Sequence, residues 1–404
     1  MKEVYCALCA HCADALLVSE YRDPFQVDDL RKGIWKFNWL PVHSPEFVQP
    51  GPVVYKSQGL SSRLGLSGLY IAFNGWWPER GAEVKTCTFK EFEAAVVLQN
   101  AMENGMPGLT VASAGNTARA FCHLSPVCGF PVIIVVPGMC IVDMWYPKGR
   151  TKVPTLVVSD GDYADSIDVA KRVALISGWP FEGGVNNISK RDGLGVVLLE
   201  AVACMGRLPD CYFQAVGSGA GAVGVSEMAA RLVRDGRFGA VLPKLHLAQN
   251  IPFTPMVNAW NKGSRTLFSE DLNPDLICEI TTRVLSSRYP AYSVRGGLYD
   301  ALAASGGAMY GVTNEEVYEA QEIFMDAEGI DIGPAAGVAV AALINAARSN
   351  KIRENDTILL NITGGGEKKF AETHKTYKVE PVLVTKDISD ADIESLLCQI
   401  LKKN

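Results

Sequence analysis

The sequence has no apolar run that approaches the length of a membrane-spanning helix. Such a helix needs about 20 consecutive apolar residues, and apolar stretches such as residues 131–136 have only the length of a β-strand. The first residues also lack the apolar core of a secretion signal. We therefore expect a cytoplasmic protein without a membrane partner.

The sequence also lacks an excess of charge of one sign, internal repeats and low-complexity segments. Its 38 basic and 44 acidic residues give a net charge of −6, and these charges are not gathered into tails. This mild balance argues against a nucleic-acid partner, because phosphate backbones are bound by concentrated positive charge. With 404 residues, 48 % of them apolar, the chain is long enough for two domains with sizeable cores.

A complete set of metal-binding cysteines is also missing. The 11 cysteines are scattered through apolar segments, which is typical of reduced thiols in a cytosolic protein. Cys6, Cys9 and Cys12 repeat at three-residue spacing around His11, which resembles half of a tetrahedral metal site. The next cysteine is Cys87, so one tight loop would have to supply every ligand. We expect a knuckle without a bound metal.

Short apolar stretches alternate with longer helical patterns along most of the chain. The predicted strands are residues 53–55, 69–73, 109–112, 132–136, 155–158, 211–216, 245–248 and 357–361. The predicted helices are residues 117–128, 164–176, 192–205, 227–234 and 338–347, and the predicted loops include residues 61–63 and the tryptophan pair 76–77. This alternation predicts an α/β protein, with helices on the faces of a parallel sheet.

Lys90 lies where we expect a helix to begin. Thr88 with Glu91 three residues later has the pattern of a capping box, which predicts a helix through Gln99. In a first helical turn the amide N–H groups and the positive end of the helix dipole disfavour an ammonium ion. A partly neutral lysine there is a nucleophile that can form a Schiff base. The alternative is an ordinary solvated lysine.

A glycine-rich segment follows the predicted strand 211–216 and opens the next helix. It consists of Gly217, Ser218, Gly219, Ala220 and Gly221. Glycines let backbone N–H groups approach a ligand and a helix N-terminus favours negative charge, so the segment predicts a phosphate cradle. A purely structural turn is the alternative.

The same glycines also fit the G-x-G-x-x-G pattern of dinucleotide sites through Gly219, Gly221 and Gly224. That interpretation needs an acidic residue at the end of the next strand, to hold a ribose. The next strand ends in Gln249 and Asn250 instead. A small phosphate is therefore favoured over a dinucleotide.

Two further segments place small polar side chains directly after predicted strands. Residues 113–117 stand at a helix N-terminus, where hydroxyls and free amides can bind a carboxylate and Asn116 can bond a ring oxygen. Thr363 precedes three glycines, and its hydroxyl could meet a ring nitrogen in a cleft. Taken alone, the first is an ordinary helix cap and the second a turn residue.

In this order the segments resemble the fold-type II pyridoxal-phosphate enzymes, most closely the threonine synthase branch. The N-terminal cysteines and residues 33–37 also resemble the opening of threonine synthases. The resemblance covers nearly the whole chain. It implies pyridoxal phosphate as the cofactor and a tryptophan synthase β-like fold, in which two three-layer α/β domains hold the cofactor in the cleft between them.

The resemblance also implies roles and domain boundaries. Lys90 would be the catalytic residue and would hold the cofactor through a Schiff base, while Asn116 would bond its phenolic oxygen and Thr363 would face its pyridine nitrogen. The residues expected to hold its phosphate are Gly217, Ser218, Gly219, Ala220 and Gly221. The residues expected to bind substrate are Ser113, Ala114, Thr117 and Arg119. The expected domains are an N-terminal extension (1–45), a large domain (46–94 and 185–404) and a small domain (95–184).

The chain departs from the threonine synthases around Lys90. Those enzymes follow the lysine with an aspartate and an arginine, whereas Glu91 and Phe92 follow it here. Residues 55–65 and 86–90 resemble the cysteate synthases of methanogenic archaea instead. This implies a β-replacement in which O-phospho-L-serine and sulfite give L-cysteate and phosphate, a step towards coenzyme M. The alternative is the threonine synthase reaction on O-phospho-L-homoserine.

A β-replacement of two anionic substrates needs a base and positive charge. Lys90 would remove the α-proton and later return it. The neutral hydroxyl of Thr363 would leave the pyridine nitrogen unprotonated, which suits prompt loss of a β-substituent. The candidate cations near the β-carbon are Lys85, Arg119, Lys190 and Arg191. We also expect a homo-oligomer and a lid at the tryptophan pair 76–77; a cofactor-free binding protein is disfavoured because all the cofactor-binding segments are kept.

Overall fold

The computed structural model describes residues 9, 11, 15–147 and 153–401 of the chain. The predicted cysteine knuckle therefore lies largely outside the described residues, since Cys6 and Cys12 are not among them. Within the described part, no cluster of three or more His, Cys, Asp or Glu side chains is suited to a metal ion. No helix of that part is both long and apolar enough to cross a membrane.

Two separate β-sheets organise the fold. The larger sheet has the order β1-β2-β12-β9-β10-β11, and all neighbouring strands in it are parallel except β1 and β2. Its strands are β1 (Val53–Lys56), β2 (Leu69–Phe73), β12 (Ile358–Ile362), β9 (Cys211–Ala215), β10 (Lys244–Asn250) and β11 (Ala308–Val312). The smaller sheet is fully parallel in the order β14-β8-β6-β5. Its strands are β14 (Val382–Val384), β8 (Thr155–Val158), β6 (Val132–Pro137) and β5 (Leu109–Ala112).

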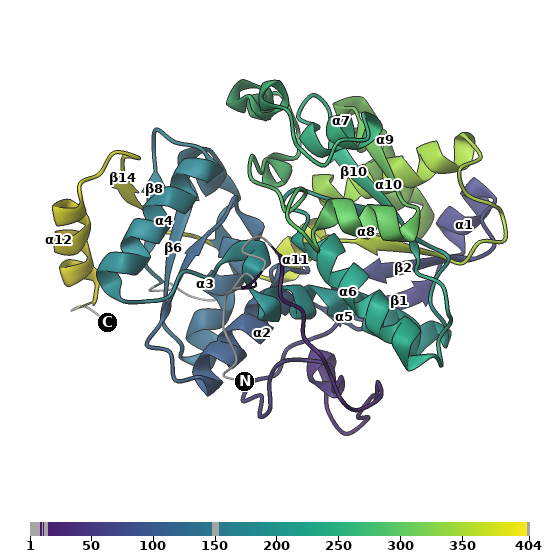
Figure 1. The fold of residues 1–404 in the computed structure, drawn as a ribbon, viewed down its shortest axis with the longest axis horizontal. Helices are drawn as coiled ribbons and strands as arrows, with labels where there is room; N and C mark the ends of the chain where they lie inside the picture. Colours follow the sequence, from purple (N-terminus) through teal and green to yellow (C-terminus); the bar gives the residue numbers. More distant parts are fainter. Residues whose placement is uncertain (1–8, 10, 12–14, 148–152, 402–404) are drawn as a thin grey trace.

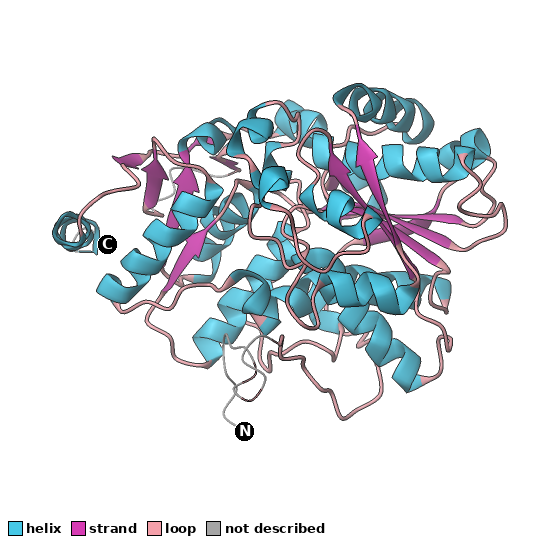
Figure 2. Ribbon diagram, turned by 45° about the horizontal axis from the view of Figure 1, so that its top comes forward, coloured by secondary structure: helices cyan, strands magenta, loops and turns pink. Residues whose placement is uncertain are grey.

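Helices cover both faces of each sheet, as Figure 2 shows for the larger one. The helices are α1 (Gly59–Leu64), α2 (Lys90–Glu103), α3 (Asn116–Cys128), α4 (Tyr163–Ser177), α5 (Ile188–Met205), α6 (Ala220–Asp235), α7 (Pro255–Asn261), α8 (Leu298–Ser305), α9 (Asn314–Glu328), α10 (Pro334–Arg348), α11 (Glu367–Thr373) and α12 (Asp390–Leu401). Four further strands have two residues each. Strand β3 (Trp76–Trp77) pairs with β4 (Ala82–Glu83), and β7 (Trp145–Tyr146) pairs with β13 (Tyr377–Lys378).

Buried strands of the larger sheet send apolar side chains to both faces. In β9, Tyr212 belongs to the core that contains α2, α5 and α6, whereas its neighbour Phe213 belongs to the core that contains α9 and α10. Adjacent strand residues point to opposite faces, so a strand covered on both sides must be apolar throughout. The predicted α/β class is confirmed, because helices flank two mostly parallel sheets.

The end of the chain returns to the smaller sheet. Strand β14 pairs with β8, and α12 packs against α4 (Figure 1). This corrects the expectation that residues 185–404 belong wholly to the large domain. The other boundaries of that division stay a prediction.

The prediction from local sequence is wrong at three places. Residues 61–63 lie in helix α1 instead of a loop, and the tryptophan pair forms strand β3. The capping box is also wrong: Phe89 occupies the N-cap of α2 without a side-chain cap bond, and the Glu91 carboxylate accepts from the Thr86 amide. Long-range contacts also act at each place, since the amides of Leu60, Trp76 and Phe89 donate to Glu328, Gly365 and Thr363 respectively.

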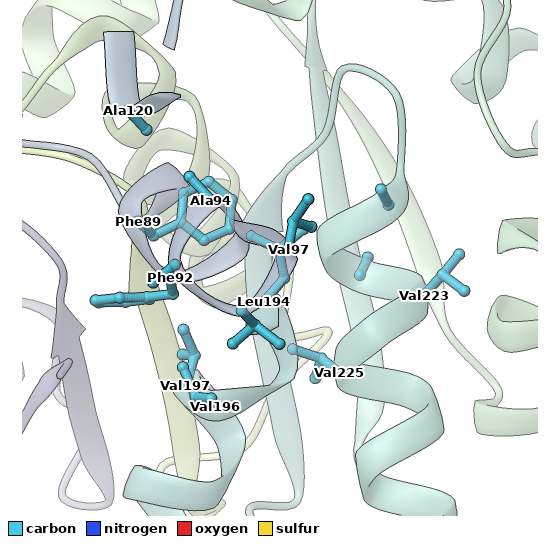
Figure 3. Packing of buried hydrophobic residues seen from close by; sticks show 14 of the residues in the cluster. Phe89, Phe92, Ala94, Val97, Ala120, Leu194, Val196, Val197, Val223 and Val225 are labelled. Atoms are coloured by element: carbon cyan, nitrogen blue, oxygen red, sulfur yellow. The ribbon is translucent and has the colours of Figure 1, made fainter. Parts of the chain in front are cut away.

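Helices α2, α5 and α6 pack unusually closely because glycines face their neighbours. A β-carbon on Gly224 of α6 would lie 2.2 Å from the carbonyl oxygen of Arg191 in α5, and one on Gly193 of α5 would lie 2.7 Å from the carbonyl of Phe92 in α2. Figure 3 shows Phe92, Leu194 and neighbouring valines filling the space between these helices. This packing fixes the position of α2, whose first residue is Lys90.

We predict that Gly224→Ala lowers the thermal unfolding midpoint, because the new methyl group meets backbone that cannot rotate away. Overpacking of this kind costs about 1–3 kcal/mol. Ser226→Ala, on the same helix at a half-buried position, is the matched control and should change stability by less than about 0.5 kcal/mol. Equal midpoints for the two variants, measured by circular dichroism, would contradict the close helix packing.

His246 of β10 makes the stability of the fold depend on pH. Its ring is stacked on Phe213 at 4.5 Å, lies 5.8 Å from the Tyr310 ring and has its Nδ1 atom 2.7 Å from the Tyr310 hydroxyl. Burial, with a smaller effect of Lys244, lowers the pKa of His246 from 6.5 to about 4. Below pH 6.5 the unfolded chain binds a proton at this histidine. The folded chain does not bind it until the pH falls to about 4.

We predict that this histidine weakens the fold as the pH falls from about 6.5 towards 4, by up to roughly 3 kcal/mol. His246→Gln should flatten the decline of the unfolding free energy in that window, as measured by urea titrations at several pH values. His43→Gln, at an exposed position, should follow the wild-type curve. Parallel curves for wild type and His246→Gln would refute the prediction.

Candidate active site

A small pocket lies between the two sheets, at the carboxyl ends of parallel strands. Its volume is about 80 Å³. Segments that follow β5, β9 and β12 line it, together with the start of α2. Its lining includes Lys90, Ser113, Ala114, Asn116, Thr117, Gly217, Ser218, Gly219, Gly221 and Thr363, so the structure brings the predicted segments together. Ligands of α/β proteins characteristically bind at such strand ends.

Lys90 occupies the first position of α2, which confirms the predicted placement in a first helical turn. Its side chain is 17 % exposed, and its Nζ atom lies 3.0 Å from Glu93 Oε2 and 4.6 Å from the centre of the Phe89 ring. Burial lowers the pKa of Lys90 below its ordinary value, although the Glu93 carboxylate opposes this change. The amine is therefore more nucleophilic at neutral pH than an exposed lysine.

A second lysine, Lys190 of α5, lines the same pocket in the opposite electrostatic setting. Its Nζ atom lies 3.1 Å from Glu93 Oε1 and 3.2 Å from Glu182 Oε1. Burial alone would lower the pKa of Lys190, but the two carboxylates outweigh burial and raise it. Lys190 thus stays a charged ammonium, while Lys90 is the one suited to form a Schiff base.

Glu93 connects these two lysines. It is fully buried, and its Oε1 atom also accepts a hydrogen bond of 2.6 Å from the Thr117 hydroxyl. Burial would raise the pKa of Glu93, but Lys190 and Lys90 together hold it below the ordinary value. Neither Glu93 nor Glu182 was predicted as a site residue. The only sequence signal for Glu93 was its position one helical turn after Lys90, which puts both on one helix face.

The glycine segment between β9 and α6 has the geometry of an anion cradle. Gly219 is the N-cap of α6 and has φ +83°, a backbone conformation that favours glycine. A β-carbon on Gly217 would lie 2.9 Å from Leu285, and one on Gly221 would lie 2.9 Å from Gln214. The first N–H groups of α6 have no acceptor within the helix, so they can bind a phosphate.

The segment before α3 is held in place by its own hydroxyl. Ser113 Oγ accepts hydrogen bonds of 3.0 Å from the amides of Gly115 and Ala118. The Oδ1 atom of Asn116 accepts a bond of 3.2 Å from Nη2 of Arg119. Because the amide oxygen is engaged, the Asn116 NH₂ group is left as a donor for another partner.

Thr363 lies directly beside the start of α2. It is 7 % exposed, and its carbonyl accepts a 3.0 Å hydrogen bond from the Phe89 amide. The bridge between Thr88 and Gly364 continues this contact. Residues 363–364 and 88–90 are therefore fixed relative to each other although they are far apart in the sequence.

Five predicted features do not line the pocket: Lys85, Arg119, Arg191, Ala220 and the tryptophan pair. Lys85 does not line it, and Arg191 is fully buried against Glu227, away from the lining. The tryptophan pair does not form a lid, because Trp77 packs against Phe73 at 5.5 Å and is only 8 % exposed. Trp76 packs on the ring of Phe370 in α11.

The pocket fits pyridoxal phosphate on its own chemistry. An amine with a lowered pKa can bind the aldehyde, free helix amides can hold the phosphate, and an amide donor and a hydroxyl can meet the ring substituents.

Residues 80–364 match the family described as pyridoxal-phosphate dependent enzyme. The chain belongs to this family. It is 46 % identical over 380 residues to a cysteate synthase of Methanosarcina barkeri, covering 93 % of this chain and 91 % of that protein. It is 48 % identical over 359 residues to a cysteate synthase of Methanoculleus marisnigri, covering 87 % of this chain and 82 % of that protein.

Solved structures of more distant proteins share the fold. Maize serine racemase superposes with a TM-score of 0.61 at 15 % identity, covering 79 % of this chain and 90 % of that chain. The processed form of a threonine deaminase from Solanum lycopersicum gives a TM-score of 0.56 at 17 % identity, covering 79 % and 87 % of the two chains. The expected fold-type II architecture and the expected cofactor, pyridoxal phosphate, are thereby confirmed for this pyridoxal-phosphate dependent enzyme.

We predict that sodium borohydride fixes the cofactor of the purified holoenzyme to Lys90 and not to Lys190, because only Lys90 has a lowered pKa. Peptide mass spectrometry after reduction identifies the modified lysine. Lys90→Ala should abolish the covalent label, and Lys85→Ala, an exposed lysine of the same segment, should retain it. A label on Lys190 would overturn the assignment.

Proposed function

We propose that the protein converts O-phospho-L-serine and sulfite to L-cysteate and phosphate. The observation that carries this proposal is a largely buried lysine amine of lowered pKa, set in a pocket at the strand ends of a chain that is 46 % identical to a protein named cysteate synthase. The match covers about nine-tenths of both chains. The product would serve coenzyme M formation in the cytoplasm of a methanogen.

In this proposal Lys90 holds the cofactor and handles the proton of the reaction. When bound, pyridoxal phosphate supplies an electron-accepting ring that stabilises negative charge at the α-carbon of the amino acid. The Lys90 amine would take the α-proton of the amino acid. Glu93 Oε2 lies 3.0 Å from Lys90 Nζ and would hold the resulting ammonium ion close to the substrate.

The bonds change at the β-carbon. The C–O bond breaks and phosphate leaves with the electron pair. The sulfur lone pair of sulfite then forms the C–S bond, and Lys90 returns the proton to the α-carbon. No oxidant or reductant is needed, because one oxyanion replaces another.

The remaining site residues would bind and orient. We propose that Asn116 donates to the phenolic oxygen of the cofactor, that the amides of residues 217–221 hold its phosphate and that Thr363 faces its ring nitrogen. We propose that Ser113, Ala114 and the backbone amides of their loop bind the substrate carboxylate. The Thr117 hydroxyl serves Glu93 instead, because it already donates to that carboxylate at 2.6 Å.

We predict that the purified holoenzyme releases phosphate from O-phospho-L-serine only when sulfite is present, and that L-cysteate forms in equal amount. Lys90→Ala should reduce the rate by at least about a thousandfold, since both the covalent attachment and the base are lost. Phosphate release and cysteate are measured by colorimetry and mass spectrometry.

The control substrate is O-phospho-L-homoserine with water, which tests the threonine synthase alternative. Release of phosphate from phosphohomoserine alone, without cysteate from phosphoserine, would reject the proposed function.

A further inference from the structure

A second, larger cavity adjoins the proposed cofactor pocket. Its volume is about 650 Å³. Residues that line both spaces are Asn116, Val284, Ala335 and Thr363, so the two are neighbours without an intervening layer. Its lining includes the exposed side chains of Arg283 and Lys378, so the cavity reaches solvent. A small molecule could therefore pass from solvent through this cavity to the pocket.

Arg119 adds positive charge to the cavity lining and bonds Asn116, one of the residues that line both spaces. Its side chain is 5 % exposed, and its guanidinium lies over Trp145, 4.6 Å from the ring centre. Its Nη2 atom bonds Asn116 at 3.2 Å and Glu367 at 2.8 Å, while the buried Nε atom has no hydrogen-bond partner among the described residues. Arg119 is thus rigid, buried and incompletely satisfied, as expected of a group that awaits an anion.

Lys378 is fixed to the same aromatic residue from another part of the chain. It lies directly opposite Trp145 in the pairing of β13 with β7. Its Nζ atom donates to the carbonyl of Val142 at 2.5 Å, which leaves two further N–H groups of the ammonium for a ligand.

Arg283 supplies a third cation on an anchored loop. The amide of Thr282 donates to Asn250 Oδ1 at 3.2 Å, and that of Thr281 donates to Asn314 Oδ1 at 3.0 Å. These bonds hold the backbone of residues 281–282, which directly precede Arg283. The Arg283 side chain is exposed and forms no salt bridge with a carboxylate in the described ranges. Its planar guanidinium is therefore available for a bidentate bond to an oxyanion.

We propose that this cavity binds the sulfite nucleophile, with Arg119, Arg283 and Lys378 holding its oxygens. This inference rests on the proposed function. The donors would bond the three oxygens and leave the sulfur lone pair free to face the pocket that holds the amino acid. Carboxylates also line the cavity: Asp143 and Glu279 are exposed, and Glu367, 45 % exposed, competes with sulfite for Arg119. Departing phosphate is an oxyanion as well and takes the same route.

The first test is the Michaelis constant for each substrate. Arg283→Gln and Lys378→Gln should each raise KM for sulfite about tenfold, the effect of one charged hydrogen bond, while KM for O-phospho-L-serine changes less than about twofold. Lys375→Gln, an exposed lysine of the same segment that does not line the cavity, makes the same charge change and should leave both constants unchanged. A selective rise in KM for phosphoserine would assign the cavity to the phosphoryl group of that substrate and overturn the proposal.

Glu367→Gln should change KM for sulfite in the opposite direction. It removes the carboxylate that occupies Arg119, so KM for sulfite should fall severalfold. A rise in this constant would contradict the role of Arg119 in binding sulfite.

Binding is measured separately from turnover with sulfate as the probe. Sulfate has the charge and oxygens of sulfite but no lone pair on sulfur, so it binds without reacting. Titration calorimetry of the holoenzyme should show sulfate binding that the Arg283→Gln/Lys378→Gln double variant loses. If wild type binds sulfate in this way but makes no cysteate, the proposed function fails and the anion site stands. If cysteate forms while the double variant keeps sulfate binding and KM for sulfite, the anion site fails.

Discussion

The active-site pocket depends on one buried carboxylate, Glu93. A negative charge fully removed from water is tolerated only when it is paired and hydrogen-bonded. Glu93 meets this condition with Lys90, Lys190 and Thr117, which come from three different helices. The same contacts make the two lysines unequal, because Lys190 has a second carboxylate, Glu182, and Lys90 does not. One lysine can therefore be a nucleophile while the other stays charged.

The order of strands brings the remaining parts of the pocket to this carboxylate. Strand β12 comes late in the sequence but inserts between β2 and β9. Thr363, at its end, is therefore adjacent to the start of α2, and the glycine segment after β9 is its neighbour on the other side. Close packing of α2, α5 and α6 through glycines holds Lys90 and Lys190 at a constant separation. The chemistry is local, but its geometry is set by the whole larger sheet.

Much of this arrangement was predictable, because several of its parts have a recognisable pattern within a few consecutive residues. Lys90 at a helix start, the glycine segment after a strand and Thr363 before three glycines each have a short-range pattern, and most strands lie where the apolar runs are. Glu93 and Lys190 could not be paired in advance, since 97 residues separate them and nothing local links them. The helix at residues 59–64 and the strand at the tryptophan pair depend on tertiary contacts in the same way. The return of β14 to the smaller sheet also has no local signal.

That return has a mechanical consequence. Following the strands in order, the chain passes from the larger sheet to the smaller between β4 and β5, back between β8 and β9, and out again between β12 and β14. Two bodies joined by three covalent connections can rock about a shared axis but cannot swivel or slide freely. A closure of the two sheets over a ligand would have to bend all three connections together. A label attached near the C-terminus would travel with the smaller body and report its angle directly.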